Sequence, residues 1–76
     1  MQCSLDRLPQ GISAKVQKLD CKREIVERLK DFGLIEGTMV RVRYKSPDKG
    51  VIAMEFRDTV IAMRSRDLKG VKVEWV

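Results

Sequence analysis

Hydrophobic and polar positions follow two different periods in the middle of the chain. From residue 24 to 32 the apolar residues recur at helical spacing, which predicts a helix with one apolar stripe, formed by Ile25, Val26, Leu29 and Phe32. From residue 39 to 45 apolar and polar residues alternate, which predicts a strand with Val40, Val42 and Tyr44 on its buried face. The sequence therefore predicts a helix followed closely by a strand.

Segment 33–38 connects these two elements and is predicted to be a tight joint. Gly33 follows the last apolar helical position, where a helix often ends in a left-handed residue that glycine adopts without a steric cost. Leu34 is predicted to fold back on the last helical turn, and Gly37 to turn the chain into the strand. Ile35 has no obvious burial within this joint. A loop residue presented by rigid elements often serves recognition, so Ile35 is a predicted contact residue.

The rest of the pattern predicts further short elements. The helix is expected to run from about Cys21 to Phe32, with Asp20 as its N-cap. Further strands are expected at 12–19, 51–56, 59–64 and 71–75, with turns at 46–50 and 57–58. Residues 65–68 suggest one helical turn capped by Ser65 with Leu68 pointing inward. Residues 1–8 are expected to form a short, flexible start.

These elements predict a single domain over residues 1–76 that is mainly β with one α-helix. There are about five short strands, the helix lies between the first two, and the other connections are too short for helical crossovers. An antiparallel meander that closes into a small barrel fits this order, and closure would leave no exposed sheet edge. Strand number alone does not choose between barrel types.

Several segments in a fixed order resemble the FeoA domain, the small cytosolic component of bacterial ferrous iron uptake. The main one is RLKDFGLIEGTMV at 28–40, preceded by LPQG at 8–11 and AKV at 14–16, and followed by SPDKG at 46–50, MEFR at 54–57 and IAMR at 61–64. The resemblance covers nearly the whole chain and implies an SH3-like antiparallel β-barrel. It also implies a cytosolic partner of the ferrous permease FeoB, a GTPase.

Two positions depart from the family pattern. Asp58 stands where a glycine is usual in the last hairpin turn, and aspartate tolerates the left-handed region better than most residues. Leu68 stands where a small residue is common, which changes the packing expected at that end of the domain. Neither departure conflicts with the fold.

Composition excludes several classes of function. The chain has no histidine, and no serine or cysteine lies in a recognisable nucleophile motif, so catalysis is not expected. The two cysteines, Cys3 and Cys21, are far apart and lack histidine neighbours, which makes a metal site or a cofactor unexpected. Cys21 lies one helical turn before Ile25, so a buried apolar role is the simplest interpretation and a ligand or redox role the alternative. No apolar run approaches ~18 residues, and together with the unpaired cysteines this suggests a reduced cytoplasmic protein that is not membrane-embedded.

The net charge of +5 raises the question of an acidic partner. Arg41, Arg43 and Lys45 share the outward face of one predicted strand, where a solvated surface, an acidic protein and nucleic acid are the three alternatives. Single-strand nucleic-acid binders interleave basic residues with exposed aromatic ones. The aromatic residues are all predicted to face inward: Phe32, Tyr44, Phe56 and Trp75. Nucleic acid is therefore the weaker alternative.

The leading hypothesis is a non-catalytic module that binds a FeoB-type permease at its GTPase region or inner face. The residues predicted to contact the partner are Arg28, Leu29, Ile35, Arg41 and Arg43. A small basic barrel that binds nucleic acid is the rival. A third possibility is a role like that of the related domain of metal-dependent repressors, in which this fold makes contacts within one chain.

Overall fold

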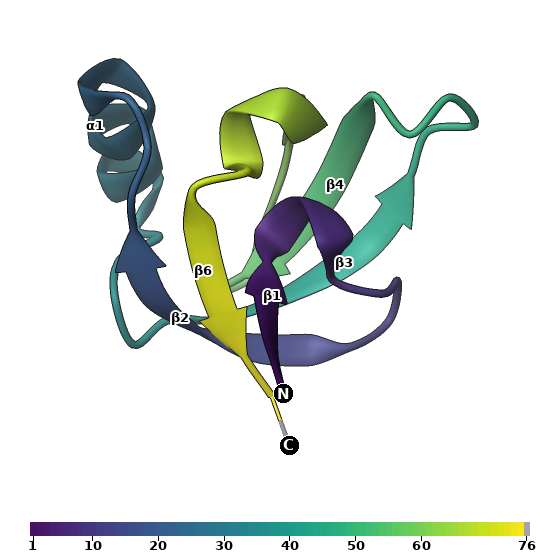
Figure 1. The fold of residues 1–76 in the computed structure, drawn as a ribbon, viewed down its shortest axis with the longest axis horizontal. Helices are drawn as coiled ribbons and strands as arrows, with labels where there is room; N and C mark the ends of the chain where they lie inside the picture. Colours follow the sequence, from purple (N-terminus) through teal and green to yellow (C-terminus); the bar gives the residue numbers. More distant parts are fainter. Residues whose placement is uncertain (76) are drawn as a thin grey trace.

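The computed structural model describes residues 1–75, and this part of the chain contains one six-stranded antiparallel sheet and one α-helix (Figure 1). The elements follow in the order β1 (Gln2–Ser4), η1 (Leu5–Arg7), β2 (Ser13–Leu19), α1 (Arg23–Phe32), β3 (Met39–Lys45), β4 (Val51–Phe56), β5 (Thr59–Arg64), η2 (Ser65–Leu68) and β6 (Val71–Glu74). The two η elements are single 3-10 turns. The expected strands and helix are all present, and every bound lies within two residues of its predicted position.

The sheet is strongly bent but open. The strand order is β1-β6-β2-β3-β4-β5, and within the described residues no ladder joins β1 to β5. The two 3-10 turns contact each other across this gap, and η2 also contacts β5. The predicted closed barrel is therefore wrong in its hydrogen bonding, because both outer strands keep a free edge.

The first residues form an extra strand rather than a flexible start. Gln2 pairs with Glu74 and Ser4 with Lys72, so β1 extends the sheet beside β6. Leu5 and Leu8 follow and are fully buried. This corrects the prediction for residues 1–8 and adds one strand, so that α1 now lies between the second and third strands.

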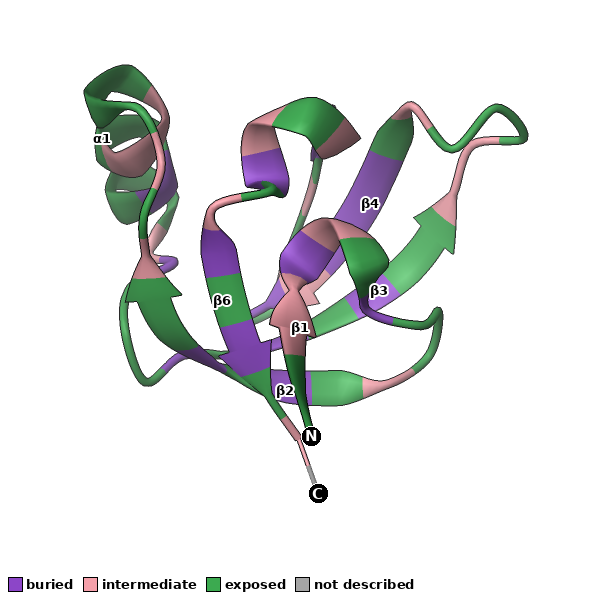
Figure 2. Cartoon of the chain, in the orientation of Figure 1, coloured by how far each residue is buried: buried purple, intermediate pink, exposed green. Residues whose placement is uncertain are grey.

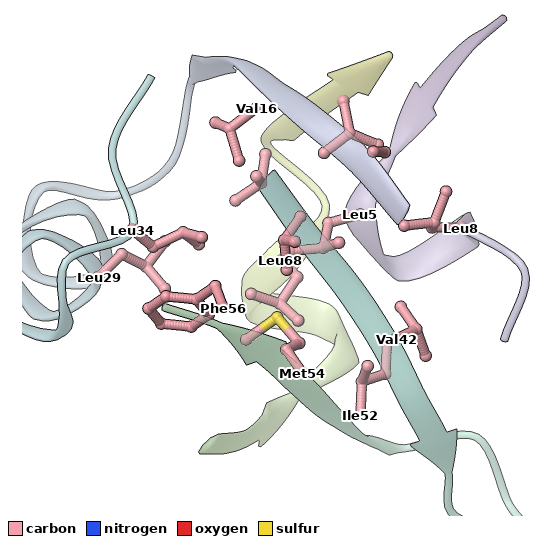
Figure 3. Close-up of a cluster of buried hydrophobic side chains, with 14 of the residues drawn as sticks. Leu5, Leu8, Val16, Leu29, Leu34, Val42, Ile52, Met54, Phe56 and Leu68 are labelled. Carbon is pink, nitrogen blue, oxygen red and sulfur yellow. The ribbon is translucent and has the colours of Figure 1, made fainter. Parts of the chain in front are cut away.

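The core lies inside the bend of the sheet. Strand residues alternate between buried and exposed as their pleat requires, which the colours along β6 in Figure 2 show. Leu5, Leu29, Leu34 and Leu68 enter this core from outside the strands, and none of them is exposed to solvent. Figure 3 shows these side chains pointing into one cluster with Val42, Met54 and Phe56. The inward prediction for Leu68 is confirmed.

The predicted hairpin turn is present, whereas the two predicted helix caps are not. Arg57 and Asp58 have φ angles of 50° and 63°, so the predicted hairpin turn forms with aspartate in place of glycine. Asp20 is not the N-cap of α1. Lys22 occupies that position without a side-chain hydrogen bond, and Ser65 likewise does not cap η2. Both caps were predicted from residue type alone.

Candidate partner-binding surface

The predicted joint after α1 has a Schellman motif at its start. Gly33 has a φ of 97°, its N–H donates to the carbonyl of Lys30 at 2.9 Å, and the N–H of Leu34 donates to the carbonyl of Leu29 at 2.8 Å. Leu29 and Leu34 are both fully buried. The prediction that Leu34 folds back on the helix is confirmed, and the joint is anchored in the core.

Thr38 holds the remainder of the joint. Its hydroxyl accepts a hydrogen bond from the N–H of Ile35 at 3.2 Å and donates to the carbonyl of Gly33 at 3.4 Å. The N–H of Gly37 donates to the carbonyl of Val16 at 2.8 Å, which ties the joint to β2. Thr38 was not singled out from the sequence. A threonine three residues after Ile35, in a turn that also holds Gly37, is the signal that could have identified it.

Ile35 projects from this fixed joint. The residue is 40% exposed, and this exposure agrees with the expectation from the sequence. It lines an open groove between the helix and the end of β2, whose other lining residues are Leu19, Val26, Lys30 and Glu36. The lining is thus mainly apolar and includes one charge of each sign. A partner side chain that is apolar with a polar end would fit this surface.

The two helix residues in the predicted contact set differ in burial. Arg28 is exposed on α1, whereas Leu29 is fully buried and supports the joint from inside. Leu29 therefore presents no side chain to a partner, which corrects its place in the set. Phe32 was expected in the core but is 46% exposed. The apolar stripe of α1 is narrower than the sequence pattern suggested, because only Leu29 is buried outright.

Arg41 and Arg43 converge on one carboxylate. Glu55 on the neighbouring strand β4 lies 2.8 Å from Arg41 and 3.5 Å from Arg43. The hydrogen bond from Arg41, supported by the charges of both guanidinium groups, holds the pKa of Glu55 below its ordinary value. The basic face of β3 is therefore partly neutralised within the molecule.

Tyr44 gives the same face an aromatic side chain. It is 57% exposed, contrary to the inward prediction. The register of β3 shifts between Val42 and Tyr44, which places Tyr44 opposite Ala53. This irregularity moves Tyr44 out of strict alternation with the buried residues of β3. Phe56 is buried and Trp75 is half-buried, so the inward prediction holds fully only for Phe56.

The predicted contact residues fall into two groups. Ile35 lines the groove beside α1, and Arg41 lines a different groove with Glu55, Arg57 and Asp58. No residue is shared by the two grooves. Arg28 lines neither of them. Sequence proximity in the segment 28–43 therefore does not produce one continuous surface.

Metal ligands and reactive thiols are sparse in the described part of the chain. Residues 1–75 contain no group of three or more histidine, cysteine, aspartate or glutamate side chains placed to hold a metal ion. Cys3 and Cys21 are both half-buried and unpaired, and burial raises the pKa of each thiol. Because the thiolate is the reactive form, a raised pKa makes both side chains poor nucleophiles. No helix in residues 1–75 has the length and apolar character needed to cross a bilayer.

One bent antiparallel sheet, one helix and a surface rich in arginine define a small, mainly β domain. The chain belongs to the FeoA domain family, whose profile matches residues 3–74. This confirms the resemblance seen in the sequence. No curated protein matches the chain.

Solved structures of FeoA proteins share this fold. The FeoA protein of Chlorobium tepidum superposes with a TM-score of 0.87 at 26% identity, over 92% of this chain and 67% of that one. FeoA of Stenotrophomonas maltophilia, solved with zinc, superposes with a TM-score of 0.76 at 32% identity, over 93% of this chain and 88% of that one. That protein is described as an SH3 domain protein and as a candidate ferrous iron transport activating factor.

The fold also occurs in longer proteins. A manganese-dependent transcriptional repressor superposes with a TM-score of 0.86 at 15% identity, and this chain spans 40% of its length. The iron(II) transport protein A of Clostridium thermocellum superposes with a TM-score of 0.88 at 26% identity, and this chain spans 45% of that one. The likeness to the repressor concerns the fold alone.

Proposed function

We propose that this chain is a non-catalytic accessory protein of ferrous iron transport that binds a FeoB-type GTPase permease from the cytoplasmic side. The match to the FeoA family over residues 3–74 is the observation that carries the proposal. The description of the Stenotrophomonas maltophilia protein as a candidate transport activating factor supports it. A domain of this kind acts by binding one conformation of its partner more tightly than another.

The groove beside α1 is the proposed principal contact. The backbone of Ile35 is held there by the hydrogen bonds of Thr38, so little loop freedom is lost when a partner binds. Arg28 lies on the adjoining helix, and Arg41 and Arg43 form a second, separate contact on β3. Their exposed guanidinium groups suit acidic residues at the rim of an interface.

The proposal is tested by binding of the purified chain to the permease of the same organism, both full-length in nanodiscs and as its isolated GTPase region. The variants are Ile35→Asp, Arg41→Asp and the double variant. We expect the double variant to bind at least about tenfold more weakly, because a buried carboxylate would face an apolar contact and an attractive charge would be reversed. The single variants show which of the two groups makes the contact.

Lys69→Asp is the matched control for Arg41→Asp, since it makes the same charge change at an exposed position outside both groups. Each variant is first compared with the wild type by thermal unfolding. A folded double variant with unchanged affinity would show that the chosen surface is wrong. If the wild-type chain binds neither form of the permease, the proposed function itself is wrong.

Nucleic-acid binding is a second candidate because Tyr44 is exposed beside Arg43 on β3. An exposed aromatic ring next to arginine is the arrangement that stacks on single-stranded bases. A titration with a single-stranded oligonucleotide at increasing salt tests it. Phosphate binding predicts a steep loss of affinity with salt and a further loss in Tyr44→Ala. Affinity that is unchanged in Tyr44→Ala would contradict this candidate.

A further inference from the structure

Strand β5 leaves one edge of the sheet free. It pairs with β4 from Phe56↔Thr59 to Val51↔Arg64, and β4 is its only partner strand in residues 1–75. The hairpin turn has two residues, so hydrogen-bonded pairs begin at Thr59 and alternate along the strand. The backbone groups of Val60 and Ala62 therefore face away from β4. Within the described residues, no turn or loop bonds to the backbone of either residue.

This edge is apolar and unprotected. Val60 is 55% exposed and Ala62 is also exposed, and β5 contains neither proline nor a bulge. Natural proteins usually protect free edges with charges, prolines, bulges or very short strands. The opposite edge follows that rule, because β1 has only three residues. Strand β5 has six residues, and the charge of Arg64 at its end is the one such protection that it carries.

An apolar surface adjoins the edge on the outer side of the sheet. Tyr44 on β3 pairs with Ala53 on β4, and Ala53 pairs with Ala62 on β5, so the three residues form one row that ends at the free edge. Val51, which is 40% exposed, pairs with Arg64. Tyr44, Val51 and Val60 are three of the large apolar side chains that this protein exposes. Side chains of an added strand would extend this surface.

The charges around this surface are mainly positive. Arg64 lies at the end of β5, and Arg41 and Arg43 lie on β3. Glu55, on the strand β4 between β3 and β5, already forms ion pairs with Arg41 and Arg43. The whole chain carries a net charge of +5. A second copy of the same chain would bring equal positive charge to this edge, which disfavours self-association. An acidic polypeptide segment is the occupant with complementary charge.

We propose that β5 binds an extended acidic segment of a partner protein as an additional strand of the sheet. Backbone groups of the segment pair with those of Val60 and Ala62, apolar side chains extend the surface that contains Tyr44, and a carboxylate lies near Arg64. The inference does not depend on which protein supplies the segment. The proposed function shares Arg41 and Arg43 with this surface, but its principal contact lies beside α1. The two proposals fail separately, because the peptide experiment below does not involve the permease.

The experiment uses a capped nine-residue peptide of alternating valine and glutamate, with a valine and lysine peptide of equal length as its charge control. Binding is measured by NMR titration of the full chain. We expect chemical-shift changes confined to β5 and to the adjoining residues on the outer face of the sheet, and slower amide hydrogen exchange at Val60 and Ala62. The lysine peptide should bind at least about tenfold more weakly, because it places positive charge near Arg64.

Backbone pairing is tested on the peptide, so that the protein stays unchanged. Two versions are made, one with N-methylated glutamates and one with N-methylated valines. Successive strand residues point their N–H groups to opposite sides, so only one version blocks the groups that face β5. We expect one version to lose binding and the other to keep it. Equal affinity of both versions would overturn edge pairing.

A protein variant gives an independent test. Ala62→Pro removes the outward N–H without breaking a hydrogen bond to β4. Ala62→Thr is the control, because threonine keeps this N–H and favours the strand conformation. We expect Ala62→Pro to lose at least about tenfold in peptide affinity and Ala62→Thr to retain it. Peptide binding that shifts other residues, no binding of the glutamate peptide, or dimers of the free chain through β5 would each overturn the proposal.

Discussion

Gly70 and Asp20 pack backbone against backbone. The N–H of Asp20 donates to the carbonyl of Gly70 at 2.8 Å, and a Cβ on Gly70 would overlap the carbonyl group of Asp20. The contact joins the end of β2 to the start of β6 just before α1 begins. It depends on the missing side chain, not on an unusual φ angle.

Gly70→Ala should therefore destabilise the fold strongly. Since the overlap is with backbone, no side-chain rotation relieves it, and we expect a loss of about 3 kcal/mol in the free energy of unfolding. Urea unfolding measures the change. Gly50→Ala is the comparison, because its nearest contact is the side chain of Asp48. Equal effects of the two substitutions would contradict this packing.

Gly33→Ala should cost less, and for a different reason. The atoms nearest to a Cβ at this position belong to the Arg57 side chain at ordinary contact distance, so the cost comes from the φ of 97°. We expect a loss of about 1–2 kcal/mol in the free energy of unfolding. Gly33→Asn, with a residue that tolerates the left-handed region, should recover part of this loss. If asparagine proves no better than alanine, backbone strain is not the cause.

The helix should tolerate truncation at Phe32 but not at Leu29. Leu29→Ala leaves a cavity under the helix and should lower the free energy of unfolding by about 2–5 kcal/mol. Phe32→Ala removes a side chain that is 46% exposed, and we expect a smaller loss of about 1 kcal/mol. Thermal and urea unfolding compare the two variants. A larger loss for Phe32→Ala would show that the helix packs on another face.

The contribution of Glu55 to stability should disappear in acid. Hydrogen bonding from Arg41 lowers the pKa of Glu55 in the folded chain, so the folded state binds this proton less tightly than the unfolded state. The contribution is present above the ordinary glutamate pKa and is lost as the pH falls through the lower folded value. The difference in unfolding free energy between the wild type and Glu55→Gln should therefore shrink toward low pH.

Arg41→Gln provides the matched background for this measurement. Without its main partner, Glu55 should show a smaller pH-dependent difference, which a double-mutant cycle isolates. A difference between the wild type and Glu55→Gln that stays constant from neutral to acid pH would exclude the ion pair as its source.

The sequence correctly predicted the elements that are determined by residues close together along the chain. The helix end at Gly33, the turn at Arg57 and the alternation in β3 as far as Val42 depend on a few neighbouring residues, and the structure contains all of them. Family resemblance then supplied the class of fold, but not the sixth strand or the open edges of the sheet. The exposed position of Ile35 followed from the same joint.

Features created by distant pairing were missed. Strand β1 exists because Gln2 and Ser4 meet Glu74 and Lys72 from the far end of the chain, and no pattern within residues 1–8 indicates this. The register shift in β3 exposed Tyr44 against its alternation. Phe32 matched the helical period, yet it is 46% exposed, and Leu29 is the residue of α1 that is fully buried. The candidate contact residues were predicted one by one from the sequence, whereas the burial of Leu29 and the separation of Ile35 from Arg41 depend on packing.

The two ends of the domain meet. The N–H of Trp75 donates to the carbonyl of Met1 at 2.9 Å, and both ends leave the sheet at the same corner (Figure 1). A domain with adjoining ends can be spliced into a loop of a host protein without stretching either chain, or circularly permuted through a short linker. The tip between β3 and β4 offers an exposed place for the new ends of such a permutant.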